Sequence, residues 1–136
     1  MKKLFTMILV LCSLLSGNAY AEKVFLKCEL VSGFVSWKDK SKNVVYEKGE
    51  LSDVGLEINT KTKKIFDISY SDFPVVINDW DDNKVRWTQP NNLFRKNSYT
   101  LDRLTGKLFN LINYHDDYPM LGQMLNYKCS AAKKLF

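Results

Sequence analysis

Apolar and polar residues alternate with a period of two where the main body of the chain begins. Residues at every second position share one face of a β-strand, so the alternation predicts a strand that carries Cys28 toward the core. The apolar set is Val24, Leu26, Cys28 and Leu30, and the opposite set is Phe25, Lys27 and Glu29.

Short apolar-rich runs, each bounded by turn-forming residues, continue along the rest of the chain. They are residues 34–37, 44–50, 54–58, 65–70, 75–78, 85–88, 98–102, 107–112 and 125–130. Such lengths and spacing are typical of an antiparallel meander. We therefore predict an all-β fold, a curled sheet or small barrel. No window has a sustained helical stripe, and the best candidate for a helical turn lies near residues 118–125, where Pro119 could open it and Gly122 would weaken it.

Two of the predicted hairpins share one sequence pattern. Residues 56–66 align without gaps onto residues 99–109. The Asn59 and Asp102 side chains can bind the backbone two residues on and start a turn, and Gly106 can adopt the positive φ that completes one. Two similar half-sheets would explain the likeness, but one favourable hairpin used twice is the interpretation we favour.

The first 21 residues have the pattern of an export signal. Lys2 and Lys3 precede an apolar run over residues 4–15, and Ala19-Tyr20-Ala21 supplies the small residues that signal peptidase requires. A membrane anchor would need about 20 apolar residues, more than this run offers. We expect residues 1–21 to be a signal peptide cleaved after Ala21. Residues 22–136 then form a single β domain, without a further membrane span, in the periplasm or outside the cell.

Loss of Cys12 with the signal peptide leaves two cysteines near opposite ends of the chain, Cys28 and Cys129. In an oxidising compartment such a pair predicts one structural disulfide that closes the fold. A bond across so long a loop stabilises a domain by about 4 to 5 kcal/mol in the chain-entropy model. A redox pair would normally have Cys-x-x-Cys spacing, and a zinc site would need more ligands than two cysteines and one histidine.

Charge and composition limit the partners. The chain has 20 basic and 15 acidic residues, and removal of Lys2 and Lys3 leaves an excess of only about +3. This excess is too small for a polybasic arm, so no nucleic-acid partner is expected. The hydrophobic content of 46% predicts a packed domain rather than a disordered chain.

Few residues suggest catalysis or metal binding. His115, beside two aspartates, could act as a general base or bind a divalent ion, but a polar loop before Pro119 is the simpler interpretation. Asp79, Asp81 and Asn83 match three positions of a calcium loop, whereas Lys84 and Pro90 replace its glycine and glutamate. We expect no enzyme activity, no metal and no cofactor.

The aromatic residues are the remaining signal. A turn at residues 81–84 should bring Trp80 and Trp87 onto neighbouring strands. Together with Tyr99 and His115 they form our candidate face for a ligand or partner, because aromatic side chains offer large contact areas at small entropic cost. Core packing is the competing interpretation for each aromatic residue, and the more common one.

The chain resembles a loose group of small exported bacterial proteins of uncharacterised function. The closing Tyr127-Lys128-Cys129 strand and the Leu101–Lys107 hairpin carry the resemblance, which implies an early cysteine paired with Cys129 and no particular activity. A weaker likeness is to the small β-barrel inhibitors of lysozyme. These present a Ser-Gly loop to the enzyme cleft, and Ser32-Gly33 is the one candidate here, in surroundings that look like a strand.

These observations predict a non-catalytic exported binding or protein-interaction module, with an envelope protein or a glycan as its partner. The alternative is an inhibitor of an envelope-active hydrolase such as lysozyme. A third hypothesis is a hydrolase with His115 as its base.

Overall fold

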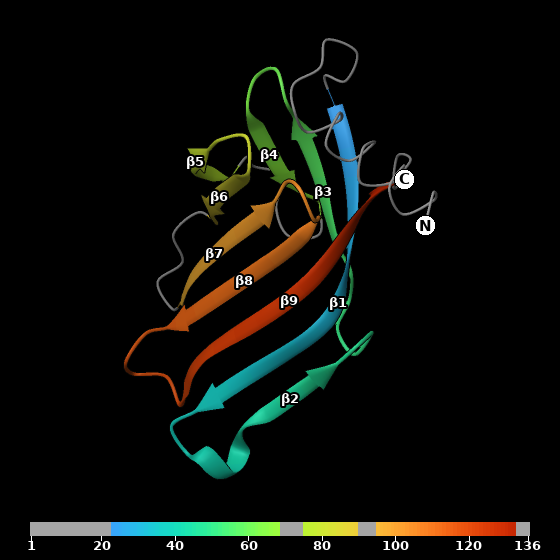
Figure 1. The fold of residues 1–136 in the computed structure, drawn as a ribbon. Helices are drawn as coiled ribbons and strands as arrows, with labels where there is room; N and C mark the ends of the chain where they lie inside the picture. The colour runs from blue at the N-terminus through green and yellow to red at the C-terminus, as the bar shows by residue number, and fades with distance from the viewer. Residues whose placement is uncertain (1–22, 69–74, 90–94, 133–136) are drawn as a thin grey trace.

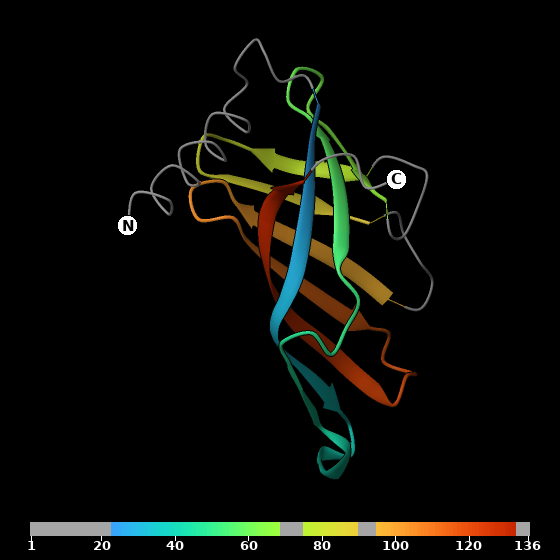
Figure 2. The ribbon, with the colours of Figure 1, turned by 90° about the vertical axis from the view of Figure 1, so that its right-hand side faces the viewer.

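The computed structural model describes residues 23–68, 75–89 and 95–132. Over these residues the chain forms nine strands in one antiparallel sheet that is nearly closed into a barrel, which confirms the predicted all-β fold (Figures 1 and 2). The strands are β1 (Lys23–Trp37), β2 (Val44–Glu47), β3 (Val54–Asn59), β4 (Lys64–Asp67), β5 (Val76–Trp80), β6 (Lys84–Thr88), β7 (Arg95–Asp102), β8 (Lys107–Tyr114) and β9 (Met120–Ala132). A single 3₁₀ turn, η1 (Lys40–Lys42), precedes β2.

The sheet has the order β4-β3-β1-β9-β8-β7-β6-β5, and β2 pairs with the second half of β1. The first and last strands are therefore neighbours at its centre. The backbone N–H of Val75, just before β5, donates to the carbonyl of Ile65 in β4 at 3.0 Å. This contact links the two ends of the strand order, as the curled shape of the sheet requires (Figure 2).

Strand β1 contains both of the first two predicted strands. Its register shifts between Leu30 and Ser32, so Val31 is the extra residue of a β-bulge. Alternate residues from Val24 to Leu30 are buried before the bulge, whereas Gly33 and Val35 are buried after it. The bulge reverses the alternation, which is why the sequence pattern suggested two separate strands.

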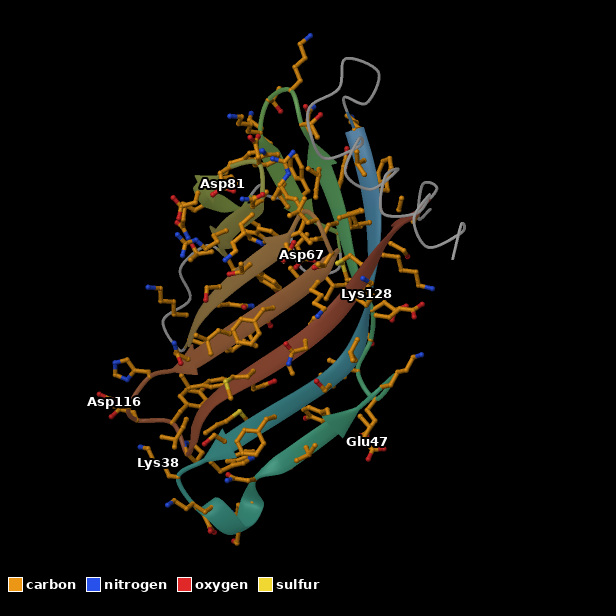
Figure 3. The ribbon with its side chains drawn as sticks, in the orientation of Figure 1. Lys38, Glu47, Asp67, Asp81, Asp116 and Lys128 are labelled. Atoms are coloured by element: carbon orange, nitrogen blue, oxygen red, sulfur yellow. A yellow bond between two sulfur atoms is a disulfide. The ribbon has the colours of Figure 1, made fainter. Side chains whose placement is uncertain are left out.

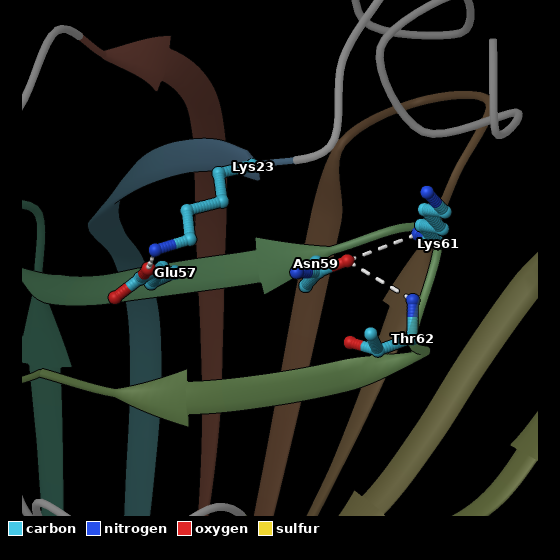
Figure 4. A network of polar contacts seen from close by, with 5 residues as sticks. All are labelled: Lys23, Glu57, Asn59, Lys61 and Thr62. Atoms are coloured by element: carbon cyan, nitrogen blue, oxygen red, sulfur yellow. Dashed lines mark hydrogen bonds and ion pairs between the residues drawn. The ribbon is translucent and has the colours of Figure 1, made fainter. Parts of the chain in front are cut away.

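The two similar hairpins form as predicted. The Asn59 Oδ1 accepts hydrogen bonds from the backbone N–H groups of Lys61 and Thr62 at 3.1 and 3.0 Å (Figure 4), and the Asp102 Oδ1 accepts the equivalent pair. Lys63 and Gly106 occupy matching positions with φ of 54° and 75°.

The places of these hairpins in the sheet are different. Strand β3 lies between β1 and β4, whereas its sequence match β7 lies between β6 and β8. The likeness is therefore that of one local turn used twice rather than of two equivalent half-sheets.

The predicted helical turn at residues 118–125 is wrong. From Met120 onward this segment is β9, which pairs with β1 on one side and β8 on the other. Backbone pairing on both edges outweighs the weak local preference of a segment that contains glycine. Gly122 is itself required by the pairing, since a Cβ there would lie 2.6 Å from the Ile112 carbonyl oxygen. The predicted 65–70 run ends in the structure at Asp67, and residues 69 and 70 lie outside the described residues.

The predicted Cys28–Cys129 disulfide is present. The two cysteines are register partners in the central β1–β9 pair, and both are buried. The bond closes a sequence separation of 101 residues. It thus holds together the two strands around which the rest of the sheet is arranged.

Candidate interaction surface

The four residues predicted to form a ligand or partner face do not lie on one surface. Trp87 and Tyr99 are buried and stacked on each other, with ring centroids 5.3 Å apart. Trp80 is half-buried on the neighbouring strand, as the turn at residues 81–84 predicted, and the Arg103 guanidinium lies 5.9 Å from its ring centroid. His115 lies far from this cluster in sequence, in the exposed β8–β9 loop.

The His115 loop forms contacts within itself and with the end of β1. The His115 Nδ1 lies 3.4 Å from the Asp117 carboxylate, and the Tyr118 N–H donates to the His115 carbonyl at 2.9 Å. The Lys38 ammonium donates to the Asp116 carbonyl, at the end of the sheet where both residues are labelled in Figure 3. These are the contacts of a polar turn joining two strands.

The acidic turn between β5 and β6 is also accounted for by local structure. The Asp81 carboxylate accepts the backbone N–H groups of Lys84 and Asn83, and these hydrogen bonds lower its pKa. Asp79 forms an ion pair with Arg86. Within the three described ranges, no group of three or more His, Cys, Asp or Glu side chains could hold a metal ion.

A polar network crosses the interior of the barrel. The buried Gln89 donates to the Asp67 carboxylate at 3.0 Å, and the Asn110 amide donates to the Asn97 side chain. Burial raises the pKa of Tyr99, and the negative charge of Asp67 raises it further. The first contact links β4 to the residue that follows β6, and the second links the neighbouring strands β7 and β8.

The outer face of the sheet contains a cross-strand row without a charged residue. Its members are consecutive register partners on β2, β1, β9, β8, β7, β6 and β5. In that order they are Val45, Phe34, Met124, Leu111, Ser98, Thr88 and Val76.

The apolar members of this row gather over β2, β1, β9 and β8. Val45 is 66% exposed and Met124 46% exposed, and Phe34 and Leu111 between them are partly exposed. Phe109, on the same face of β8 two residues before Leu111, is 36% exposed. We name these five side chains the outer patch. Its immediate neighbours on that face are the uncharged Ser32, Ser36, Asn113 and Asn126. One acidic residue, Glu47, also borders it, as the exposed register partner of Ser32 two residues after Val45 on β2.

Charged side chains gather on the outer face near the first half of β1. Lys23 pairs with Glu57 at 3.4 Å (Figure 4), and Lys27 pairs with Glu29 at 3.6 Å and with Asp53 at 3.4 Å. These ion pairs thus lie along the first half of β1, and the outer patch lies over its second half.

Three lysines border the outer patch. Lys107 and Lys128 precede and follow it on β8 and β9, where they are direct register partners, and Lys96 lies on β7 near the opposite border. None of the three forms an ion pair with the residues that the structure describes, although the Lys128 ammonium donates to the Thr105 carbonyl. Lys128 is labelled in Figure 3.

The sequence interpretation missed the outer patch because its members are far apart along the chain. Each member occupies an outward position of its strand, where a charged residue is common, as Phe109 and Leu111 do on β8. Cross-strand register, which decides whether such positions become neighbours, is not encoded in any one segment.

The Ser32-Gly33 pair, compared above with the loop of lysozyme inhibitors, lies inside β1. It pairs with β2 on one side and β9 on the other, so it presents no loop. Among the described residues, no helix is long and apolar enough to cross a membrane. Comparison with protein-family models, with curated proteins and with solved structures gave no match to this chain.

Proposed function

We propose that this chain is a non-catalytic exported interaction module that binds a partner through the outer patch. The observation that carries the proposal is the contiguous, uncharged and partly exposed apolar surface on a chain of which 26% of residues are charged. Depletion of charge and enrichment in Phe and Met distinguish the centre of a protein interface from ordinary surface.

The shape of the outer patch supports a binding role. Sheets expose one face readily when that face is polar, as it is around the Lys23–Glu57 and Lys27–Asp53 ion pairs. Contiguous apolar area on a small protein is unfavourable in water and is a recognised mark of an interaction site. Methionine adapts to different partner shapes, and Met124 occupies the centre of the outer patch.

The test begins with a photoreactive residue at position 124 in the protein expressed in its own host. The cross-linked partner is identified by mass spectrometry and purified, and its affinity for the unmodified chain is measured by calorimetry. The double variant Phe109→Ser/Met124→Ser should weaken binding at least about tenfold, since two interface side chains are truncated.

Leu104→Ser is the matched control. Leu104 is 50% exposed in the β7–β8 turn, outside the outer patch, so its truncation should leave the affinity unchanged. Equal affinities for the double variant and the wild type would refute the proposal. A cross-linked product that contains carbohydrate instead of protein would make the ligand a glycan.

A further inference from the structure

We infer that the partner presents an amphipathic acidic segment, in which apolar side chains contact the outer patch and carboxylates contact the lysines beside it. This inference rests on the proposed function and adds the chemistry of the partner. Two independent observations carry it: the position of Lys107 opposite Lys128, and the presence of a further lysine at the other border of the outer patch.

The Lys107–Lys128 pair is electrostatically unfavourable in the free protein. Like charges directly opposite on neighbouring strands destabilise a sheet. The acidic residue next in that row is Glu29, on β1 opposite Lys128, but its carboxylate lies 3.6 Å from the Lys27 ammonium. In the β7–β8 turn that precedes Lys107, the Asp102 carboxylate accepts two backbone N–H groups of its own turn. Lys128 donates to the Thr105 carbonyl, but neither ammonium forms an ion pair with a described residue, so both can contact the carboxylates of a partner.

Lys96 extends the positive border. It is the register partner of Asn113, which in turn pairs with Gly122 next to the outer patch. Lysines thus lie on both sides of the Phe109–Leu111–Met124 centre. A segment with an apolar stripe and carboxylates along both edges would satisfy the apolar and the charged groups together.

The dimensions suit a short helix. Val45 to Leu111 spans β2, β1, β9 and β8, which at about 4.8 Å between strands is about 14 Å. An amphipathic helix of about ten residues has that length and repeats its apolar side chains on one face. A second copy of this chain is a poorer occupant, because stacking two outer patches would bring their lysine borders together.

The experiment uses two synthetic helical peptides of about ten to fifteen residues, a length set by the helix rise. Both carry the same leucine stripe, flanked by glutamate in one and by lysine in the other. Each is titrated into the isotopically labelled protein, and backbone amide shifts are followed by NMR. The glutamate peptide should shift resonances of β1, β8 and β9 and bind at least about tenfold more tightly than the lysine peptide at low salt.

Charge reversal supplies the decisive comparison. In Lys107→Glu/Lys128→Glu the preference should invert, so that the lysine peptide binds more tightly. Lys63→Glu/Lys64→Glu changes the net charge equally in the exposed β3–β4 hairpin and should keep the original preference.

The outcomes separate the two proposals. If both peptides shift the outer patch equally and charge reversal has no effect, the acidic partner is refuted while the interaction surface stands. If neither peptide shifts these resonances, the acidic helical partner is refuted, and the cross-linking test decides the interaction surface by itself. If phosphatidylglycerol vesicles shift them and the glutamate peptide does not, the anion belongs to a lipid and the protein partner is refuted.

Discussion

At the scale of single residues, the two matched hairpins show how one turn is built with different side chains. The Asn59 and Asp102 side chains accept equivalent hydrogen bonds from the backbone N–H groups of their turns. The position with a left-handed backbone, however, holds Lys63 in the first hairpin and Gly106 in the second. A side chain with a Cβ is disfavoured there, because the Cβ approaches the backbone too closely.

Lys63→Gly should therefore stabilise the protein. Glycine removes the energetic cost of the left-handed conformation, and this gain exceeds the entropic cost of a more flexible unfolded chain. The free energy of unfolding should therefore rise by about 0.5 to 1 kcal/mol. Lys64→Gly, one residue on in strand β4, should instead cost about 0.5 to 1 kcal/mol. Urea denaturation of the three proteins measures both effects, and equal changes for the two variants would contradict the account.

At the scale of elements, sequence patterns predicted the strands well, but predicted less well how each strand pairs with its neighbours. Period-two alternation reports which residues of a strand face inward, as it did for Val24 to Leu30. The bulge at Val31 and the closeness of β9 to β8 at Gly122 depend on the partner strand, so no local pattern contains them.

The same dependence on the partner strand explains why the sequence did not predict the outer patch. Trp87 and Tyr99, chosen from the sequence for their size, pack into the core, whereas Met124 and Phe109 stay partly exposed. Residue type predicts burial only on average, and the register of the sheet decides the individual case.

Close packing at Gly122 gives a prediction for strand β9. Gly122→Ala places a Cβ 2.6 Å from the Ile112 carbonyl oxygen, which must move, so the free energy of unfolding should fall by about 1 to 3 kcal/mol. Ser36→Ala, at the register partner on β1, tests whether any change in this row has the same effect. Thermal and urea unfolding provide the comparison, and a Gly122→Ala variant as stable as Ser36→Ala would contradict the steric account.

At the scale of the whole molecule, stability depends on the link between the first and last strands. The disulfide restricts a loop of 101 residues in the unfolded chain, which corresponds to about 4 to 5 kcal/mol in the chain-entropy model. Cys28→Ala/Cys129→Ala should lose most of that amount in urea denaturation. Wild-type protein unfolded under reducing conditions isolates the bond from the loss of the sulfur atoms. A difference below about 1 kcal/mol between the oxidised and reduced wild type would mean that the bond adds little to stability.

Placement of β1 and β9 side by side at the centre of the sheet also makes the last strand necessary for completing it. Hairpins β3–β4 and β7–β8 can form early, because their partners are adjacent in sequence. The pairing of the two halves through the centre of the sheet can form only after β9 exists, since β9 is the strand that connects β1 to β8. The nine-stranded sheet is therefore incomplete until its last strand has been synthesised.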